Sequence, residues 1–316
     1  MKFAFVFPGQ GSQSLGMMTA YGDSPILRAT FDEASAVLGR DLRQLVTDGP
    51  AEALNQTVNT QPLMLTAGIA VWRLWLDQGG PQPTVVAGHS LVEYSALVAS
   101  GALDFKESVA LVEYRARAMQ DAVAPGEGAM AAILGLDSHR VEEACTAASC
   151  GQVVEAVNYN DPHQTVIAGH AAAVDRAAEI CKNMGAKRAV RLSVSAPFHC
   201  SLMQPAANLL AARLADIRIS LPSIPVINNV DVAVVAEPAV IGDALVRQAA
   251  APVRWVETMQ KMQSEGIAHV FECGPGKVLS KLAKRSAAGL TGHAIADVGS
   301  LGDALALVTG SGESGC

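Results

Sequence analysis

The stretch TVVAGHSLVEYSALVASG, residues 84–101, decides the fold of this chain. Residues 84–87 are apolar or β-branched and predict the end of a buried strand, whereas residues 91–100 carry a helical pattern that ends at Gly101. The turn Gly88-His89-Ser90 between them is typical of a nucleophile elbow, in which a serine hydroxyl projects from the edge of a sheet. Ser90 is therefore the candidate nucleophile, and the N–H of Leu91 points toward any oxyanion formed by its attack.

The elbow motif is incomplete, so an ordinary turn remains an alternative at this point. The tripeptide Gly-x-Ser also occurs at 22–24 and 312–314, and only the copy at 88–90 lies between a strand and a helix. The full G-x-S-x-G motif has glycine where this chain has Val92. A β-branched side chain there is expected to crowd the elbow, at a cost of roughly 1 to 3 kcal/mol. We therefore expect the site to be slowed, and Val92→Gly to raise turnover or stability.

Composition limits the class of protein. Half of the 316 residues are apolar and few are aromatic, which favours helices packed on a sheet. The net charge of −7 argues against nucleic acid as a partner. Proline and glycine interrupt the longest uncharged runs, so we expect neither a membrane span nor a signal peptide, and a cytoplasmic location. The six cysteines contain no C-x-x-C pair, which predicts reduced thiols and no metal site.

The order of predicted elements indicates two domains. A break at 125–128 precedes a strand-helix-strand-strand-helix-strand series at 129–135, 138–149, 153–159, 165–169, 171–184 and 187–194. This order is that of a ferredoxin-like unit. We therefore predict a large α/β domain with a parallel sheet from residues 1–125 and 197–316, and an inserted small domain from residues 126–196.

Three further expectations concern the second half of the large domain. Residues 224–228 and 269–273 are predicted strands, and a last strand near 293–298 precedes a helix capped by Ser300. The tail at 310–316 is expected to be disordered.

Two more residues are candidates for chemistry. On the helix predicted over 108–122, Arg115 falls on the apolar stripe with Leu111, Val112 and Met119, and a buried guanidinium suits a carboxylate ligand. A structural salt bridge or a snorkelling side chain is the alternative reading of Arg115. His199 follows Pro197-Phe198 where a helix begins, a suitable place for a catalytic base, although an inert helix-start histidine fits the position equally well.

The chain resembles the malonyl-CoA:acyl carrier protein transacylase family. The matching segments extend almost from end to end: FPGQGSQ (7–13), GHSLVEYSAL (88–97), EYR (113–115), GAMAAI (128–133), NYN (158–160), SAPFH (195–199), RQAAAPVRW (247–255) and FECGPGKVL (271–279). The resemblance implies an α/β-hydrolase-like large domain with a ferredoxin-like insertion, in agreement with the order of predicted elements.

The resemblance also implies the roles of the site residues. Ser90 would be the nucleophile, His199 the base and acid, and Arg115 the clamp on the free carboxylate of the substrate. Gln10 and the N–H of Leu91 would form the oxyanion hole, and the main-chain carbonyl of Gln248 would orient the histidine. The remaining pocket residues implied are His89, Asn158, Asn160 and Phe198, whose bulky ring is similar to that of the malonyl-selective form.

The implied activity is ping-pong transfer of malonyl from malonyl-CoA to the phosphopantetheine thiol of acyl carrier protein, in fatty acid biosynthesis, with no cofactor beyond these substrates. We expect a monomer whose basic residues attract the acidic carrier. These residues form two clusters, the first at Lys182, Lys187, Arg188 and Arg191 and the second at Lys277, Lys281, Lys284 and Arg285. A serine hydrolase or thioesterase on the same scaffold, and a non-catalytic protein that binds acyl-CoA or the carrier, are the alternatives.

Overall fold

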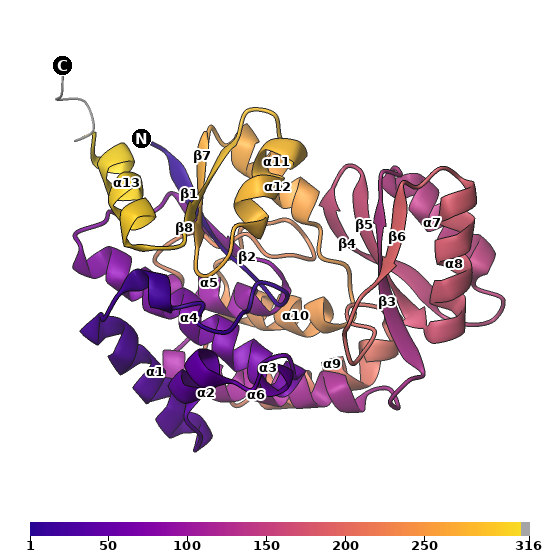
Figure 1. Ribbon diagram of the computed structural model, residues 1–316, viewed down its shortest axis with the longest axis horizontal. Helices are drawn as coiled ribbons and strands as arrows, with labels where there is room; N and C mark the ends of the chain where they lie inside the picture. The colour runs from indigo at the N-terminus through magenta and orange to yellow at the C-terminus, as the bar shows by residue number, and fades with distance from the viewer. Residues whose placement is uncertain (311–316) are drawn as a thin grey trace.

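The computed structural model describes residues 1–310, which form a large and a small lobe (Figure 1). The large lobe contains a parallel sheet in the order β2-β1-β7-β8. The small lobe contains an antiparallel sheet in the order β4-β5-β3-β6, within the segment assigned to the inserted domain. The predicted α/β fold is therefore confirmed. The strands are β1 (Phe3–Phe7), β2 (Val85–Gly88), β3 (Gly128–Leu134), β4 (Val154–Asp161), β5 (Gln164–His170), β6 (Arg188–Arg191), β7 (His269–Cys273) and β8 (Thr291–Ile295).

Both faces of the parallel sheet are covered by helices, and the side chains of β1 are buried on both of these faces. Successive side chains of a strand point to opposite faces. Phe3, Phe5 and Phe7 belong to one buried cluster, whereas Ala4 and Val6 belong to another. Helices of the first cluster include α1 (Pro25–Leu38), α4 (Thr57–Asp77), α5 (Glu93–Ala99), α6 (Phe105–Asp121) and α13 (Val298–Thr309). The second cluster is formed with α11 (Trp255–Ser264) and α12 (Val278–Ser286).

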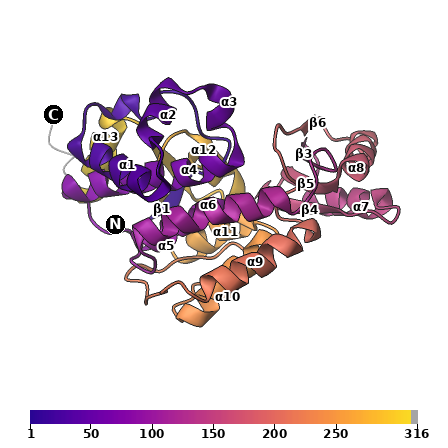
Figure 2. The ribbon, with the colours of Figure 1, turned by 90° about the horizontal axis from the view of Figure 1, so that it is seen from below.

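The remaining helices complete the two lobes. Seen from below, α6 and α9 lie side by side and extend from the large lobe toward the small one (Figure 2). Within residues 1–310, no helix combines the length and the apolar character needed to cross a membrane. These helices are α2 (Leu42–Asp48), α3 (Ala51–Leu54), α7 (Ser138–Ala148), α8 (Ala171–Asn183), α9 (Gln204–Leu214) and α10 (Pro238–Ala249), with 3-10 turns at Thr19–Tyr21, Ser90–Val92 and Ser201–Met203.

Two of the predicted local features are wrong. Residues 224–228 form only isolated bridges, in which Val86 pairs with Val226 and Ile227 with Val234, because the segment touches the edge of β2 for a single residue. The cap of α13 is Asp297, whose carboxylate accepts from the Ser300 N–H at 2.7 Å, while Ser300 completes a capping box as the third helical residue. Gly310 ends α13, and the rest of the predicted disordered tail lies outside the described residues.

The elbow depends on Gly88, the last residue of β2. A Cβ atom at this position would lie 1.8 Å from the carbonyl oxygen of Val92, so only glycine lets the following helical turn fold over the end of the strand. The side chain of Val92 has 0% of its surface exposed and belongs to the same buried cluster as Leu91 and Leu97. The close approach at the elbow is therefore made by the backbone of residue 92, and its side chain fills space in the core.

This packing replaces the expectation drawn from the missing motif glycine. We now expect Val92→Gly to lower the free energy of unfolding by about 2 to 4 kcal/mol, because it leaves a cavity and adds backbone freedom. Val92→Ala is the matched control, and its free energy of unfolding should fall by less, since it removes only the buried methyl groups. Urea denaturation of the three proteins checks this order, and a Val92→Gly protein with both higher stability and faster turnover would show instead that the valine overcrowds the elbow.

Candidate active site

Ser90 has a left-handed backbone that two hydrogen bonds hold in place. Its φ is 60°, which is uncommon for a residue other than glycine and is typical of strained functional positions. The N–H of Ser90 donates to Oδ1 of Asn229 at 2.7 Å, and Nδ2 of Asn229 donates to the carbonyl of Gly88 at 2.8 Å. Asn229 therefore bonds to the main chain on both sides of His89 and fixes the sharp turn from which the hydroxyl of Ser90 projects.

His199 lies within hydrogen-bond distance of both Ser90 and Gln248. Its Nε2 lies 2.6 Å from Oγ of Ser90, and its Nδ1 lies 2.9 Å from the main-chain carbonyl of Gln248. A carbonyl only accepts, so Nδ1 carries the proton and Nε2 accepts from the serine hydroxyl. Burial, together with the positive charge of Arg115, lowers the pKa of His199 to about 3, which keeps the imidazole neutral.

Arg115 is a buried cation beside the nucleophile. Only 1% of its surface is exposed, and its Nη2 lies 3.5 Å from Oγ of Ser90. Its other partners are neutral: Nη1 donates to Oε1 of Gln61 at 2.8 Å, and Nη2 donates to Oε1 of Gln248 at 3.0 Å. Within residues 1–310 no carboxylate lies within 4.0 Å of the guanidinium, and Nε has no hydrogen-bond partner. Burial lowers the pKa of Arg115, and an anion at this site would relieve that cost.

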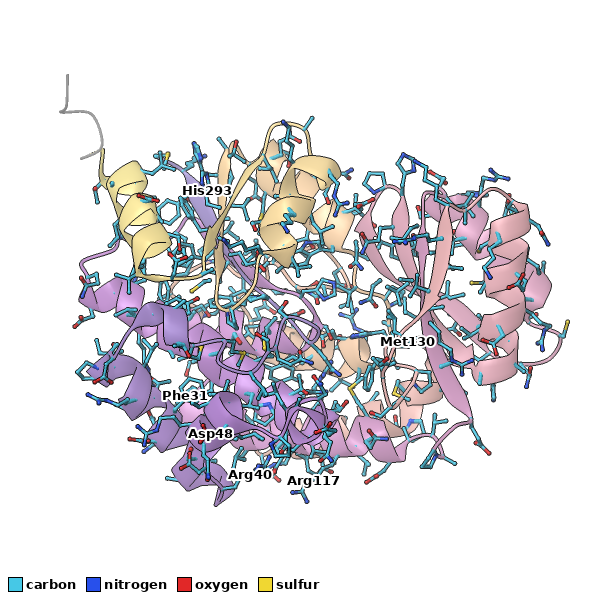
Figure 3. All side chains as sticks on the ribbon, viewed as in Figure 1. Phe31, Arg40, Asp48, Arg117, Met130 and His293 are labelled. Carbon is cyan, nitrogen blue, oxygen red and sulfur yellow. The ribbon has the colours of Figure 1, made fainter. Side chains whose placement is uncertain are left out.

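The neighbouring arginine of the same helix behaves as an ordinary surface residue. Arg117 is exposed and pairs with Glu113, one turn earlier, at 3.1 Å. Arg40 pairs with the same carboxylate, and Figure 3 shows both arginines at the lower margin of the large lobe. The helical spacing thus separates one buried guanidinium from one exposed guanidinium.

The side chain of Gln248 joins the parts of the site. Its Nε2 donates to the carbonyl of Ser90 at 3.0 Å and to Oε2 of Glu93 at 2.7 Å, while its main chain binds His199. Glu93 is 2% exposed and also accepts from the N–H of Asn229 at 3.0 Å. Burial raises the pKa of Glu93 to about 7, although its hydrogen bonds and the charge of Arg115 act in the opposite direction.

Of the two predicted oxyanion donors, Leu91 belongs to the elbow and Gln10 to a neighbouring loop, and both roles stay predictions. The N–H of Leu91 is at the second position of a 3-10 turn, where backbone donors have no partner within the helix. The loop that carries Gln10 approaches closely, since a Cβ at Gly9 would lie 2.8 Å from the carbonyl of His89. Nε2 of Gln10 donates to Oγ1 of Thr57 at 3.3 Å. The oxyanion role of Gln10 therefore stays a prediction.

The other predicted pocket residues are distributed around this centre. Nε2 of His89 is 2.9 Å from Oδ1 of Asn160, so the imidazole of His89 is engaged with β4. Oδ1 of Asn158 is buried and has no hydrogen-bond partner within the described part of the chain. Phe198 belongs to a buried cluster with Met130 and Met203, and Figure 3 labels Met130 in the small lobe. The structure thus groups Ser90 with His199, and within residues 1–310 Oδ1 of Asn158 is hydrogen-bonded to neither of them.

Gln61, Glu93 and Asn229 are site residues that the sequence reasoning missed. The sequence did carry a signal for Gln61 as a site residue, because it is a polar residue at the start of the long buried stretch of α4. Glu93 carried a weaker one as a charged residue in the first turn after an elbow serine. Asn229 carried none, since it lies 139 residues from the peptide group that it binds.

This arrangement suits nucleophilic acyl transfer with an acid-bearing acyl group. A hydroxyl, a neutral imidazole and a buried cation meet at Oγ of Ser90, with distances of 2.6 and 3.5 Å to the two partners. In the described residues no group of three or more histidine, cysteine or acidic side chains could hold a metal ion.

Comparison with known proteins identifies the family. Residues 4–297 match the acyl transferase domain family. A malonyl CoA-acyl carrier protein transacylase of Escherichia coli K12 is 52% identical over 307 residues, 97% of this chain and 99% of the relative. An acyl-carrier-protein S-malonyltransferase from Burkholderia pseudomallei has a crystal structure with a TM-score of 0.95 and 57% identity, covering 96% of this chain and 99% of that one.

A third similar protein was solved together with a partner. It is a malonyl-transacylase in complex with its type II PKS acyl-carrier protein, with a TM-score of 0.95, 50% identity, and coverage of 96% of this chain and 99% of that one. At such identities over nearly the full length, this chain is an acyltransferase that belongs to the malonyl CoA-acyl carrier protein transacylase family.

Proposed function

We propose that this enzyme transfers a malonyl group from malonyl-CoA to the phosphopantetheine thiol of acyl carrier protein, through a malonyl ester on Ser90, in fatty acid biosynthesis. One observation carries the proposal. The guanidinium of Arg115 is buried 3.5 Å from the nucleophilic oxygen and has only neutral partners. Such a cation selects an acyl group with a free carboxylate, and the names of the relatives supply the malonyl group and the carrier.

The first half-reaction would load the enzyme. Oγ of Ser90 attacks the thioester carbonyl of malonyl-CoA while Nε2 of His199 takes its proton. The carbonyl oxygen becomes an oxyanion, which the N–H of Leu91 and the amide of Gln10 would stabilise. When this intermediate collapses, the C–S bond breaks and the coenzyme A sulfur receives the proton from His199, leaving malonyl-Ser90.

The second half-reaction would reverse these steps with a different thiol. The phosphopantetheine thiol of the carrier gives its proton to Nε2 of His199 and attacks the ester carbonyl. The bond to Oγ then breaks, and Ser90 recovers its proton from the imidazole. Throughout both steps Arg115 would hold the free carboxylate, which fixes the carbonyl near Ser90. The ring of Phe198, beside His199, would leave little room for a branched acyl group.

Mass spectrometry of the intact protein tests the proposal directly. Incubation with malonyl-CoA should add one malonyl group to the wild type, on the peptide that contains Ser90, and none to Ser90→Ala. Addition of holo acyl carrier protein should then remove the group and produce malonyl carrier, whereas water alone should leave it in place. Release to water at the same rate would support a hydrolase, and malonyl-CoA binding without an adduct would support a non-catalytic binding protein.

A matched pair of variants separates the role of Arg115 at the site from the general effect of removing one positive charge. Arg115→Ala should lower kcat/KM for malonyl-CoA by about a hundredfold or more, because charge-assisted hydrogen bonds to the carboxylate are lost. The same variant should gain relative preference for acetyl-CoA, which lacks the carboxylate. Arg117→Ala, on the exposed side of the same helix, is the matched control and should keep the wild-type preference. Unchanged malonyl selectivity in Arg115→Ala, in competition between the two donors, would contradict the clamp.

The basic cluster on α12 is the better of the two candidates for carrier docking. Oγ of Ser286, the last residue of α12, donates to the carbonyl of Asn160, and the side chain of Asn160 contacts His89 next to the nucleophile. Lys281 and Lys284 are exposed on this helix and form no ion pair within the described chain. In Figure 1 the other cluster, on α8 and β6, lies in the small lobe away from α12. We therefore propose that α12 attracts the acidic carrier to the mouth of the site.

Charge reversal tests this docking surface. The double variant Lys281→Glu/Lys284→Glu should lower kcat/KM for acyl carrier protein by about tenfold at low salt, and the deficit should shrink as salt screens the charges. Its rate of loading from malonyl-CoA should change much less. The double variant Lys182→Glu/Arg188→Glu in the small lobe is the matched control and should behave as the wild type. Equal losses in both double variants, or no loss in either, would exclude a specific role for α12.

A further inference from the structure

Glu93 is a buried carboxylate that the proposed chemistry does not use. It begins α5, three residues after the nucleophile, and 2% of its surface is exposed. Its Oε2 accepts from the N–H of Asn229 at 3.0 Å and from Nε2 of Gln248 at 2.7 Å. Among the described residues it forms no ion pair within 4.0 Å. A charge buried in this way is costly, so its contacts need an explanation.

The contacts of Glu93 fix which way the amide of Gln248 faces. On one side of this amide lie two acceptors, Oε2 of Glu93 at 2.7 Å and the carbonyl of Ser90 at 3.0 Å. On the other side lies Nη2 of Arg115 at 3.0 Å, which can only donate. A reversed amide would set its NH2 group against the guanidinium and its oxygen against a carboxylate. Glu93 therefore holds the amide oxygen of Gln248 toward Arg115.

We propose that Glu93 is a positioning residue for the malonyl transfer proposed above, because it orients Gln248 and thereby presets the guanidinium of Arg115 to receive the substrate carboxylate. The inference rests on the proposed function, since it concerns how the same clamp is held. Glu93 also binds the N–H of Asn229, the residue that holds the elbow peptide. Oε2 of Glu93 thus contacts both Gln248, which orients Arg115, and Asn229, which holds the peptide of Ser90.

The intervening amide explains why this carboxylate does not compete with the substrate. A direct ion pair would occupy the N–H groups of Arg115 that a carboxylate needs for two parallel hydrogen bonds. Here the negative charge lies one side chain away, and Gln61 and Gln248 each take a hydrogen bond from one terminal nitrogen. Arg115 is oriented by the two glutamines and retains N–H groups for the substrate.

Two substitutions at position 93 separate positioning from charge. Glu93→Gln keeps an oxygen that can accept from both partners, so its KM for malonyl-CoA should stay within about threefold of the wild type. Glu93→Ala removes the shorter of the two hydrogen bonds from Nε2 of Gln248 and leaves only the one to the carbonyl of Ser90, so the amide is held less firmly. Its KM for malonyl-CoA should rise about tenfold or more, and its preference for malonyl-CoA over acetyl-CoA should fall by a similar factor.

A buried carboxylate elsewhere in the chain supplies the matched control. Glu272 on β7 is fully buried and accepts from the backbone N–H groups of Val278 and Ser280, at the start of α12. Glu272→Ala should reduce thermal stability while leaving the ratio of malonyl to acetyl transfer unchanged. If Glu93→Ala does not fold, Glu93→Asp takes its place, because it keeps the charge but withdraws it from Gln248, and the same loss of preference is expected.

The outcomes distinguish this inference from the proposed function. Wild-type protein that forms no malonyl adduct would overturn the proposed function itself. Wild-type protein that is loaded normally, together with folded Glu93→Ala or Glu93→Asp that keeps the wild-type donor preference, would overturn only the positioning role. A Glu93→Gln protein as defective as Glu93→Ala would also overturn it, because the effect would then come from the charge. The expected result is a lost preference in Glu93→Ala that Glu93→Gln restores.

Discussion

The burial of one guanidinium, with no carboxylate partner among residues 1–310, is the constraint on which this site depends. An arginine in the interior is tolerated only where hydrogen bonds replace those that water would make. Two glutamines supply them to Arg115, and one of these, Gln248, also binds the peptide of the nucleophile and the imidazole of the base. The proposed anion site and the proposed base are therefore held by a shared set of contacts.

Segments far apart in the chain contribute to this set. Ser90 follows β2 of the large lobe, whereas His199 lies on the connection that returns from the small lobe to α9. Polar contacts join the lobes around the site, among them Thr57 with Ser195 at 3.2 Å and Asp161 with Arg285 at 3.4 Å. The two lobes are therefore joined by side-chain contacts as well as by the chain itself.

Local signals made part of the site predictable from the sequence. The strand, turn and helix of residues 84–101 identify Ser90, and helical periodicity alone places Arg115 inside and Arg117 outside. His199 was a candidate from its position at a predicted helix start and was singled out by the resemblance, whereas Gln248 came from the resemblance alone, because spacing from Ser90 carries no geometric information. Asn229 and Glu93 could not be found, since their roles arise only when the topology brings distant segments together. The error at α13 has a similar origin: Asp297 and Ser300 both suit a cap, and only the backbone shows that Asp297 comes first.

The main chain and the side chain of Gln248 have different partners. Its main-chain carbonyl orients His199, and its side-chain amide faces Arg115 and Glu93. Because every amino acid offers the same main-chain carbonyl, a substitution at position 248 would leave the acceptor for Nδ1 of His199 in place. The same substitution would remove the amide contacts to Arg115, Glu93 and the carbonyl of Ser90. The tolerance of position 248 to substitution is therefore set by its amide and not by its carbonyl.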